Sequence, residues 1–226
     1  MSTMAMKTVD VAKGKLRGTY TAILIPLGVA INLVGGQVAS RLQLPLFLDS
    51  IGTAIVAAIM GPWVGAVSGI LFNIIASIIG GNLMSSLFGI CNLATALIVG
   101  YMVRFGKFKT VVHVVIATVA VALANSLLGA PIAVVVYGGI QGSGVDLAVA
   151  GFLALGNDIL SAAFLARVPI NLIDKGIAVI IAWLILLRLP ENMRNLSGKK
   201  LGKAAAEEIP VQAPSDQGSG DQGSEK

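Results

Sequence analysis

Long apolar runs constrain the fold of this chain more than any other sequence feature. Seven stretches consist mainly of aliphatic and small residues: 20–36, 47–60, 63–79, 87–103, Val111–Tyr137, 145–166 and 168–187. Several reach the roughly 17 residues that a helix needs to cross a bilayer. Charged residues make up only 12% of the 226 residues, against about 25% in ordinary soluble domains. We therefore expect an all-α integral membrane protein rather than a soluble domain or a barrel.

Basic residues indicate on which side of the membrane the connecting segments lie. Lys and Arg cluster before the first run, after the fourth and after the last, within residues 7–17, 104–109 and 188–203. The positive-inside rule places all three clusters in the cytoplasm, so an even number of crossings must separate them. We therefore predict a bundle of six transmembrane helices with both termini in the cytoplasm. The alternative is seven crossings with the basic tail outside.

Run 145–166 is the one that we expect not to cross. It carries Asp146, Asn157 and Asp158, and such side chains are costly inside a bilayer. We predict that it forms an extra outer-face helix between the fifth and sixth membrane helices. The expected parts of the chain are a cytoplasmic segment (1–18), a membrane bundle (19–190) and a disordered cytoplasmic tail (191–226). The tail is rich in Gly, Ser, Gln and acidic residues, a composition that cannot bury a core.

Several classes of function lack the residues that they need. Cys91 is the single cysteine and His113 the single histidine, so these residue types cannot build a metal site, and we expect Cys91 to be a small buried side chain. No Gly-x-x-x-x-Gly-Lys-Ser/Thr motif for ATP binding and no nucleophile-base set occurs. The net charge of +5 comes mainly from residues beside the membrane runs. We therefore predict lipid as a partner, no nucleic acid, no cofactor, no metal and no enzymatic activity.

Asparagines recur in the outer half of the predicted bundle. Intramembrane polar side chains face the bundle interior or a wet cavity, and an amide both donates and accepts hydrogen bonds. The inner halves carry almost only aliphatic and small residues. The pattern predicts a cavity that opens to the outside and binds a neutral solute, or alternatively amides that join neighbouring helices. The five residues, on five different helices, are Asn32, Asn73, Asn92, Asn125 and Asn171.

Further candidate binding residues lie where we expect outer loops and helix ends. Arg167, Asn171 and Asp174 follow one another at spacings of four and three, which places them on one helix face beside Lys175. Asp174 and Lys175 can alternatively pair with each other or with Arg167. The full set of predicted solute-binding residues is Asn32, Arg41, Asn73, Asn92, Asn125, Tyr137, Asn157, Asp158, Arg167, Asn171, Asp174 and Lys175.

Small residues repeat every four positions along two of the expected helices. Such ridges allow helix backbones to approach closely. Two ridges in so small a bundle suggest that one of them faces a partner subunit. The third helix carries Gly61, Gly65 and Gly69, and the first carries Gly18, Ala22, Pro26 and Ala30.

Two segments resemble the S components of energy-coupling-factor (ECF) importers, the membrane subunits that capture vitamins. The first is 46–54 (LFLDSIGTA), which leads to Gly61 and Gly65, and the second is 169–176 (PINLIDKG). The second is similar to the Pro-x-Asn-Leu-Ile-Lys pattern of riboflavin-type S components, with Asp174 inserted before Lys175. The resemblance covers about residues 15–190 and includes the size of the chain, its six expected helices and the ridge on the first helix.

The resemblance implies a substrate-binding subunit of a prokaryotic plasma membrane. Such a subunit captures a vitamin-like solute in its outer half, joins a transmembrane coupling subunit and two ATPase subunits, and topples to release the solute inward. ATP hydrolysis would then belong to the partners, and Ala22 and Ala30 would contact the coupling subunit. The inserted Asp174 and an aromatic content of 5% argue against assuming riboflavin, so the vitamin stays open.

Two other functions are compatible with a bundle of this kind. A membrane sensor module is one, because some histidine kinases carry similar multi-helix input domains with a related segment before the second helix. The residues after 194 contain no output domain, which favours transport. A stand-alone carrier or channel is the other, but it would need polar residues through the inner half as well.

Overall fold

The computed structural model describes the backbone of residues 2–190 and the side chains of residues 17–190. This part of the chain is all-helical, as predicted, with seven α-helices and one short 3-10 helix. The predicted tail, 191–226, lies outside the described residues. In chain order the elements are α1 (Ser2–Arg41), α2 (Ile51–Met60), α3 (Pro62–Ile79), η1 (Leu83–Phe88), α4 (Gly89–Arg104), α5 (Val111–Tyr137), α6 (Asp146–Ala154) and α7 (Ile159–Arg188).

Five helical stretches in the described residues are long and apolar enough to cross a membrane. They are Arg17–Arg41 of α1, Pro62–Ile79, Leu83–Arg104, Val111–Tyr137 and Ile159–Arg188. Helix α2 is also apolar, but its ten residues extend only about 15 Å, half of the roughly 30 Å of a bilayer core. The helices are those of a multi-pass membrane protein. A sixth crossing, made by α2 together with the segment before it, stays a prediction.

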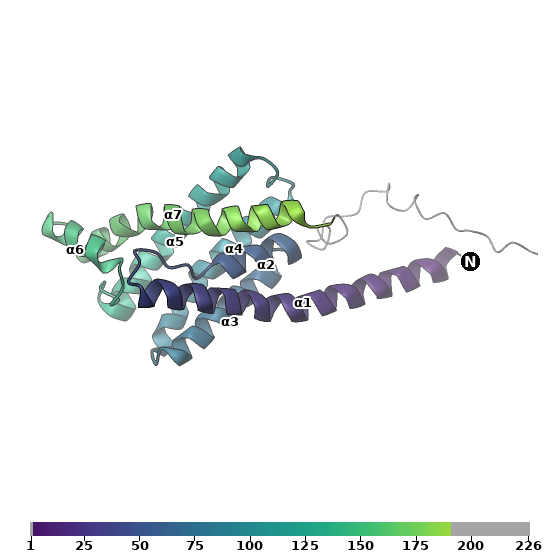
Figure 1. The fold of residues 1–226 in the computed structure, drawn as a ribbon, viewed down its shortest axis with the longest axis horizontal. Coiled ribbons are helices and arrows are strands. Elements are labelled where there is room, and N and C mark those ends of the chain that lie inside the picture. Colours follow the sequence, from purple (N-terminus) through teal and green to yellow (C-terminus); the bar gives the residue numbers. More distant parts are fainter. Residues whose placement is uncertain (1, 191–226) are drawn as a thin grey trace, which may run out of the picture.

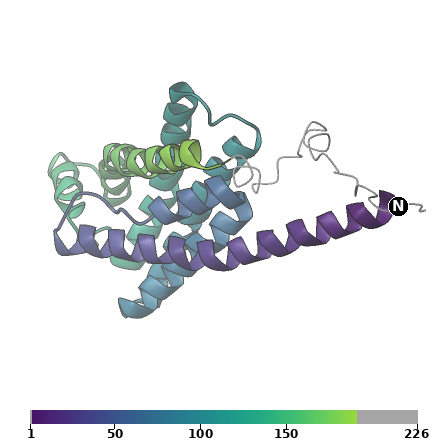
Figure 2. The same ribbon diagram turned by 45° about the vertical axis from the view of Figure 1, so that its right-hand side comes forward.

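Helix α2 lies at the centre of the bundle. It contacts α1, α3, α4 and α7, and nine of its ten residues are buried. Around it, Met60, Val99, Val121 and Val179 belong to one continuous apolar core. Many aliphatic side chains on the outward faces of the long helices are exposed, as lipid-facing positions would be. Figures 1 and 2 show α6 at one end of the bundle and the N-terminal half of α1 projecting beyond the other end.

Two glycines allow α1 and α2 to cross at close range. A Cβ atom on Gly52 would overlap the backbone of Gly28, so neither position has room for a larger side chain without a shift of the helices. Asn32, one turn after Gly28 along α1, stabilises this crossing with two hydrogen bonds. Its Nδ2 donates to Thr53 Oγ1 at 2.8 Å, and its Oδ1 accepts from the Gly52 amide at 2.7 Å.

The two small-residue ridges have different surroundings. The ridge on α3 is buried, and a Cβ atom on its Gly65 would overlap Ala57 of α2. This ridge therefore serves packing within the chain. The ridge on α1 is exposed at all four of its positions, Gly18, Ala22, Pro26 and Ala30.

The prediction of one outer-face helix over 145–166 was wrong in its extent. The structure has the short helix α6, then a turn, and the second part of the segment already belongs to α7. Gly156 adopts φ +87°, which ends α6, and Asp158 then caps α7, since its Oδ1 accepts from two backbone amides of the first turn. Because α7 begins two turns before Arg167, this side chain lies within a helix and is buried, rather than at an outer helix end.

Candidate functional site

The segment that joins α1 to α2, residues 42–50, is non-helical although helices surround it. In apolar surroundings its backbone groups need partners from elsewhere in the protein. Asp174 of α7 supplies one, because its Oδ1 accepts from the amides of Phe47 (3.1 Å) and Leu48 (2.7 Å). Asn92 of α4 supplies another, with its Nδ2 donating to the Asp49 carbonyl at 3.3 Å. Two predicted binding residues thus hold the backbone of this segment.

Lys175 compensates the carboxylates of Asp174 and Asp49. Its Nζ lies 2.7 Å from Asp174 Oδ2 and 2.9 Å from Asp49 Oδ1, and it donates to Ser50 Oγ at 3.0 Å. Lys175 and Asp174 are 3% and 1% exposed, so the pairing takes place away from solvent, where an uncompensated charge would be costly. Asp174 does pair with Lys175, and the third member of the group is Asp49 rather than Arg167.

Arg167 is buried without a carboxylate partner in the described residues. It is 2% exposed, and both ion pairs within residues 17–190 involve Lys175 instead. Its Nη2 donates to Gln141 Oε1 at 2.8 Å, and its Nη1 donates to the Ala163 carbonyl of the preceding turn at 3.2 Å. Within the described residues its two hydrogen bonds thus go to neutral acceptors.

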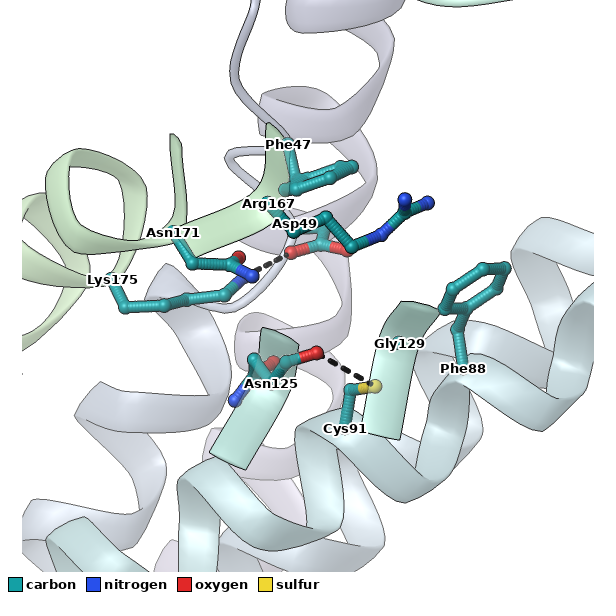
Figure 3. Close-up of a pocket in the computed structure, with 9 residues that line it drawn as sticks. All are labelled: Phe47, Asp49, Phe88, Cys91, Asn125, Gly129, Arg167, Asn171 and Lys175. Atoms are coloured by element: carbon teal, nitrogen blue, oxygen red, sulfur yellow. Dashed lines mark hydrogen bonds and ion pairs between the residues drawn. The ribbon is translucent and has the colours of Figure 1, made fainter. Parts of the chain in front are cut away.

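A small cavity, which we call the deep cavity, separates these groups from α4 and α5. Its volume is about 30 Å³. Figure 3 shows the guanidinium of Arg167 turned away from the Lys175–Asp49 pair, with the ring of Phe88 on the far side of the cavity. The lining residues are Phe47, Asp49, Phe88, Cys91, Asn125, Gly129, Arg167, Asn171 and Lys175.

A larger hollow, which we call the outer cavity, adjoins the deep cavity and shares Phe47, Asp49 and Phe88 with it. Its volume is about 290 Å³, near the lower end of the usual range for small-molecule sites. Phe88 and Tyr137 stack on its wall with ring centroids 6.4 Å apart. Its other lining residues are Phe72, Asn73, Ala76, Ser77, Gly80, Asn82, Ser85, Gln141 and Ser143.

The predicted asparagines divide into two groups. Asn125 and Asn171 line the deep cavity, and Asn73 lines the outer one. Asn32 and Asn92 line neither, and their amides bond to α2 and to the segment before it. The cavity asparagines also join helices, because Asn125 Nδ2 donates to Thr95 Oγ1 of α4 at 3.0 Å and Asn171 Nδ2 donates to Ser126 Oγ of α5 at 2.9 Å. The binding of a solute by these residues stays a prediction.

The structure gives the other predicted residues separate positions. Tyr137 lines the outer cavity, whereas Arg41 is exposed at the end of α1 and lines neither cavity. Asn157 donates to the Phe152 carbonyl at 2.9 Å, and Asp158 caps α7. Hydrogen bonds from the Ser161 side chain, and then from backbone amides, lower the pKa of the exposed Asp158 carboxyl. The hydrogen bonds of Asn157 and Asp158 are local, and neither residue lines one of the two cavities.

Several cavity residues were missing from the predicted set: Phe47, Asp49, Phe88, Cys91 and Gly129. A signal existed for Asp49, because a carboxylate inside an apolar run is costly unless it has a partner. Cys91 is buried as predicted, but it also lines the cavity, which its apolar neighbours in the sequence do not reveal. In the described residues, no group of three His, Cys, Asp or Glu side chains is arranged to hold a metal ion.

Comparison with known proteins identifies a family. The family described as "ECF transporter, substrate-specific component" matches residues 21–186, which begin within α1 and end near the C-terminus of α7. No curated protein and no solved structure matches the chain. The match covers well over half of the chain and includes every residue that lines the deep cavity. The chain therefore belongs to the family of ECF transporter substrate-specific components and is a multi-pass protein of the cell membrane.

Proposed function

We propose that this chain is the solute-capturing subunit of an ECF-type ABC importer, that its solute is a vitamin or a related micronutrient, and that ATP is hydrolysed by partner subunits. The observation that carries the proposal is the polar cavity at one end of the bundle. Arg167, Asn171 and Asn125 line a hollow in an otherwise apolar molecule, and aromatic rings flank it. A few convergent polar groups in a concave, mostly apolar site are typical of small-molecule recognition.

The opposite half of the bundle supports a binding subunit rather than a channel. Met60, Val99, Val121 and Val179 are each 0% exposed there and pack into one core. A polar solute in the cavity therefore meets an apolar barrier, and its release to the other side requires a movement of the protein. Partners that use ATP to drive such a movement fit this arrangement.

The charges at the two ends support an outward-facing cavity. Arg17, Arg104 and Arg188 lie at the ends of their apolar helical stretches that are remote from the cavity residues. The positive-inside rule assigns that end to the cytoplasm. The proposed topology has six crossings with both termini in the cytoplasm, in which α2 and residues 42–50 together form the second crossing.

The exposed ridge on α1 is our proposed contact with the transmembrane coupling subunit. A row of small residues on a lipid-facing surface permits close approach of a helix from another chain. Ala22 and Ala30 are both exposed on this row, while the comparable ridge on α3 is used within the chain.

The test is mass spectrometry of solutes that co-purify with the full-length protein in detergent. Gly129→Ala is the informative variant, because its added methyl group would stand 3.6 Å from Cys91 Sγ and 3.7 Å from Arg167 Nε, in ordinary contact inside a very small cavity. Alanine also favours the helix by up to about 1 kcal/mol over glycine. The variant should therefore lose solute while its melting temperature stays the same or rises.

The matched control is Leu172→Ala, which removes a side chain next to Asn171 that is 46% exposed toward the outside of α7. This control should retain the solute. A wild-type protein that carries no solute and shows no thermal shift with a panel of vitamins would refute the binding function. Full retention of solute by Gly129→Ala would refute the assignment of the site.

A further inference from the structure

We propose that the solute carries one acidic group, such as a carboxylate, and that Arg167 binds this group in the deep cavity. The inference rests on the proposed function and narrows its substrate class. It differs from the neutral solute that the asparagine pattern alone suggests, and the difference comes from a buried cation that forms no ion pair with a carboxylate of residues 17–190.

The carboxylates around Arg167 are already engaged by other groups. Asp49 and Asp174 lie within 2.9 Å of the Lys175 ammonium. Asp146, at the start of α6, accepts from the backbone amides of Gln141 and Ser143 at 2.9–3.1 Å. Each of these acids thus has a nearer partner. The charge of Asp146 also attracts Arg167, but Arg167 forms no ion pair within residues 17–190.

The guanidinium of Arg167 has more N–H donors than hydrogen bonds to the described residues. Arginine has five N–H groups in a planar fork that matches the two oxygens of a carboxylate. Two hydrogen bonds link the Arg167 side chain to the chain itself, one to Gln141 and one to Ala163. A buried cation with neutral partners is costly, and a bidentate anion would repay that cost more fully than a neutral solute could.

The sizes of the two cavities fit a solute with a small acidic end. The deep cavity, at about 30 Å³, has roughly a tenth of the volume of the outer cavity, so it suits the small acidic end of a solute better than the bulkier remainder. The outer cavity offers about 290 Å³ for the remainder, beside the stacked rings of Phe88 and Tyr137. The lining of the outer cavity includes Asp49 and no Lys or Arg side chain, so a second acidic group on the solute would find no cationic partner there.

The first arm of the test identifies the solute that co-purifies with the wild type and with Arg167→Gln, Arg167→Lys and Arg188→Gln. Arg188→Gln is the matched control, because it makes the same change at an exposed position near the far end of α7. We expect an acidic solute that the wild type and the control retain and that Arg167→Gln loses. Arg167→Lys keeps the charge without the planar fork and should retain an intermediate amount.

The second arm uses a pair of defined probes, 3-phenylpropionate and its uncharged amide, with thermal-shift titration at pH 7. The aromatic end matches the rings of the outer cavity, and the two probes differ mainly in charge. The wild type should bind the acid at least tenfold more tightly than the amide, and Arg167→Gln should remove this preference. Equal shifts with acid and amide, including no shift with either, would overturn the inference.

The outcomes separate this inference from the proposed function. A wild-type solute without an acidic group would overturn the role of Arg167 and leave a binding subunit in place. An acidic solute that Arg167→Gln retains in full would do the same. Absence of any solute and of any response to the vitamin panel would instead remove the proposed function, and the inference with it.

Discussion

Removal of the Lys175 ammonium should destabilise the protein strongly. In Lys175→Met the aliphatic stem is kept, but Asp49 and Asp174 lose the cation that lies 2.9 Å and 2.7 Å from them. Breaking a buried ion pair by removing one partner typically costs about 3–5 kcal/mol. At roughly 2–4 °C for each kcal/mol in a chain of this size, the melting temperature should fall by about 6–20 °C. Thermal unfolding in detergent, followed by intrinsic fluorescence, measures this shift.

A double variant tests whether the loss comes from charge rather than packing. In Asp49→Asn/Lys175→Met one of the two carboxylates is also neutralised, so part of the loss should return, with a coupling of about 0.5–3 kcal/mol. Lys109→Met removes an exposed charge and should change stability by less than about 0.5 kcal/mol. If Lys175→Met melts within about 3 °C of the wild type, or if the two changes are additive, the three charges do not form a coupled group.

Three further predictions follow from single contacts. Gly52→Val places a branched side chain against the backbone of α1 and should lower stability by about 1–3 kcal/mol in thermal unfolding, whereas Gly151→Ala, which enters open space, should not. Asp158 has a lowered pKa because of hydrogen bonds from Ser161, so its contribution to stability is present above its ordinary pKa of 3.8 and is lost as pH falls below that value. The melting temperatures of wild type and Asp158→Ala should therefore converge at low pH, and a constant difference would contradict the capping role. Ala22→Trp should keep solute binding but abolish uptake in cells that also express the coupling subunit and ATPases; normal uptake would exclude the α1 ridge as the contact.

The helical architecture could be predicted from the sequence because the bilayer leaves few choices. A long apolar run must satisfy its own backbone, so run length and composition specify α3 and α5 closely. Run 20–36 covers only part of α1, which extends from Ser2 to Arg41. The helix boundaries within segment 145–166 were harder to predict, because its apolar composition does not show that one helix ends and another begins there. Gly156 adopts a left-handed conformation and Asp158 restarts the helix, and together they divide the segment between α6 and α7.

The candidate site could be predicted only in part, because an asparagine in an apolar run can line a cavity or form hydrogen bonds to backbone groups. Asn171 and Asn125 line the cavity, while Asn32 and Asn92 bond to the region of the chain around α2. Asn32 and Asn92 bond to the region where α2 begins. The apolar composition of run 47–60 does not show that the helix begins only at Ile51. Phe47 belongs to the non-helical part of that run, before α2 begins.

The short length of α2 connects the stability of this protein with its proposed site. Because α2 has only ten residues, the backbone before it is non-helical and must find acceptors on other helices. Asp174 is such an acceptor, and its buried charge in turn requires Lys175. Lys175 also holds Asp49, which lines the cavity beside Phe47. Arg167 forms no ion pair with this group and bonds only to neutral acceptors in the described residues, and we therefore propose that it binds the charged group of the solute.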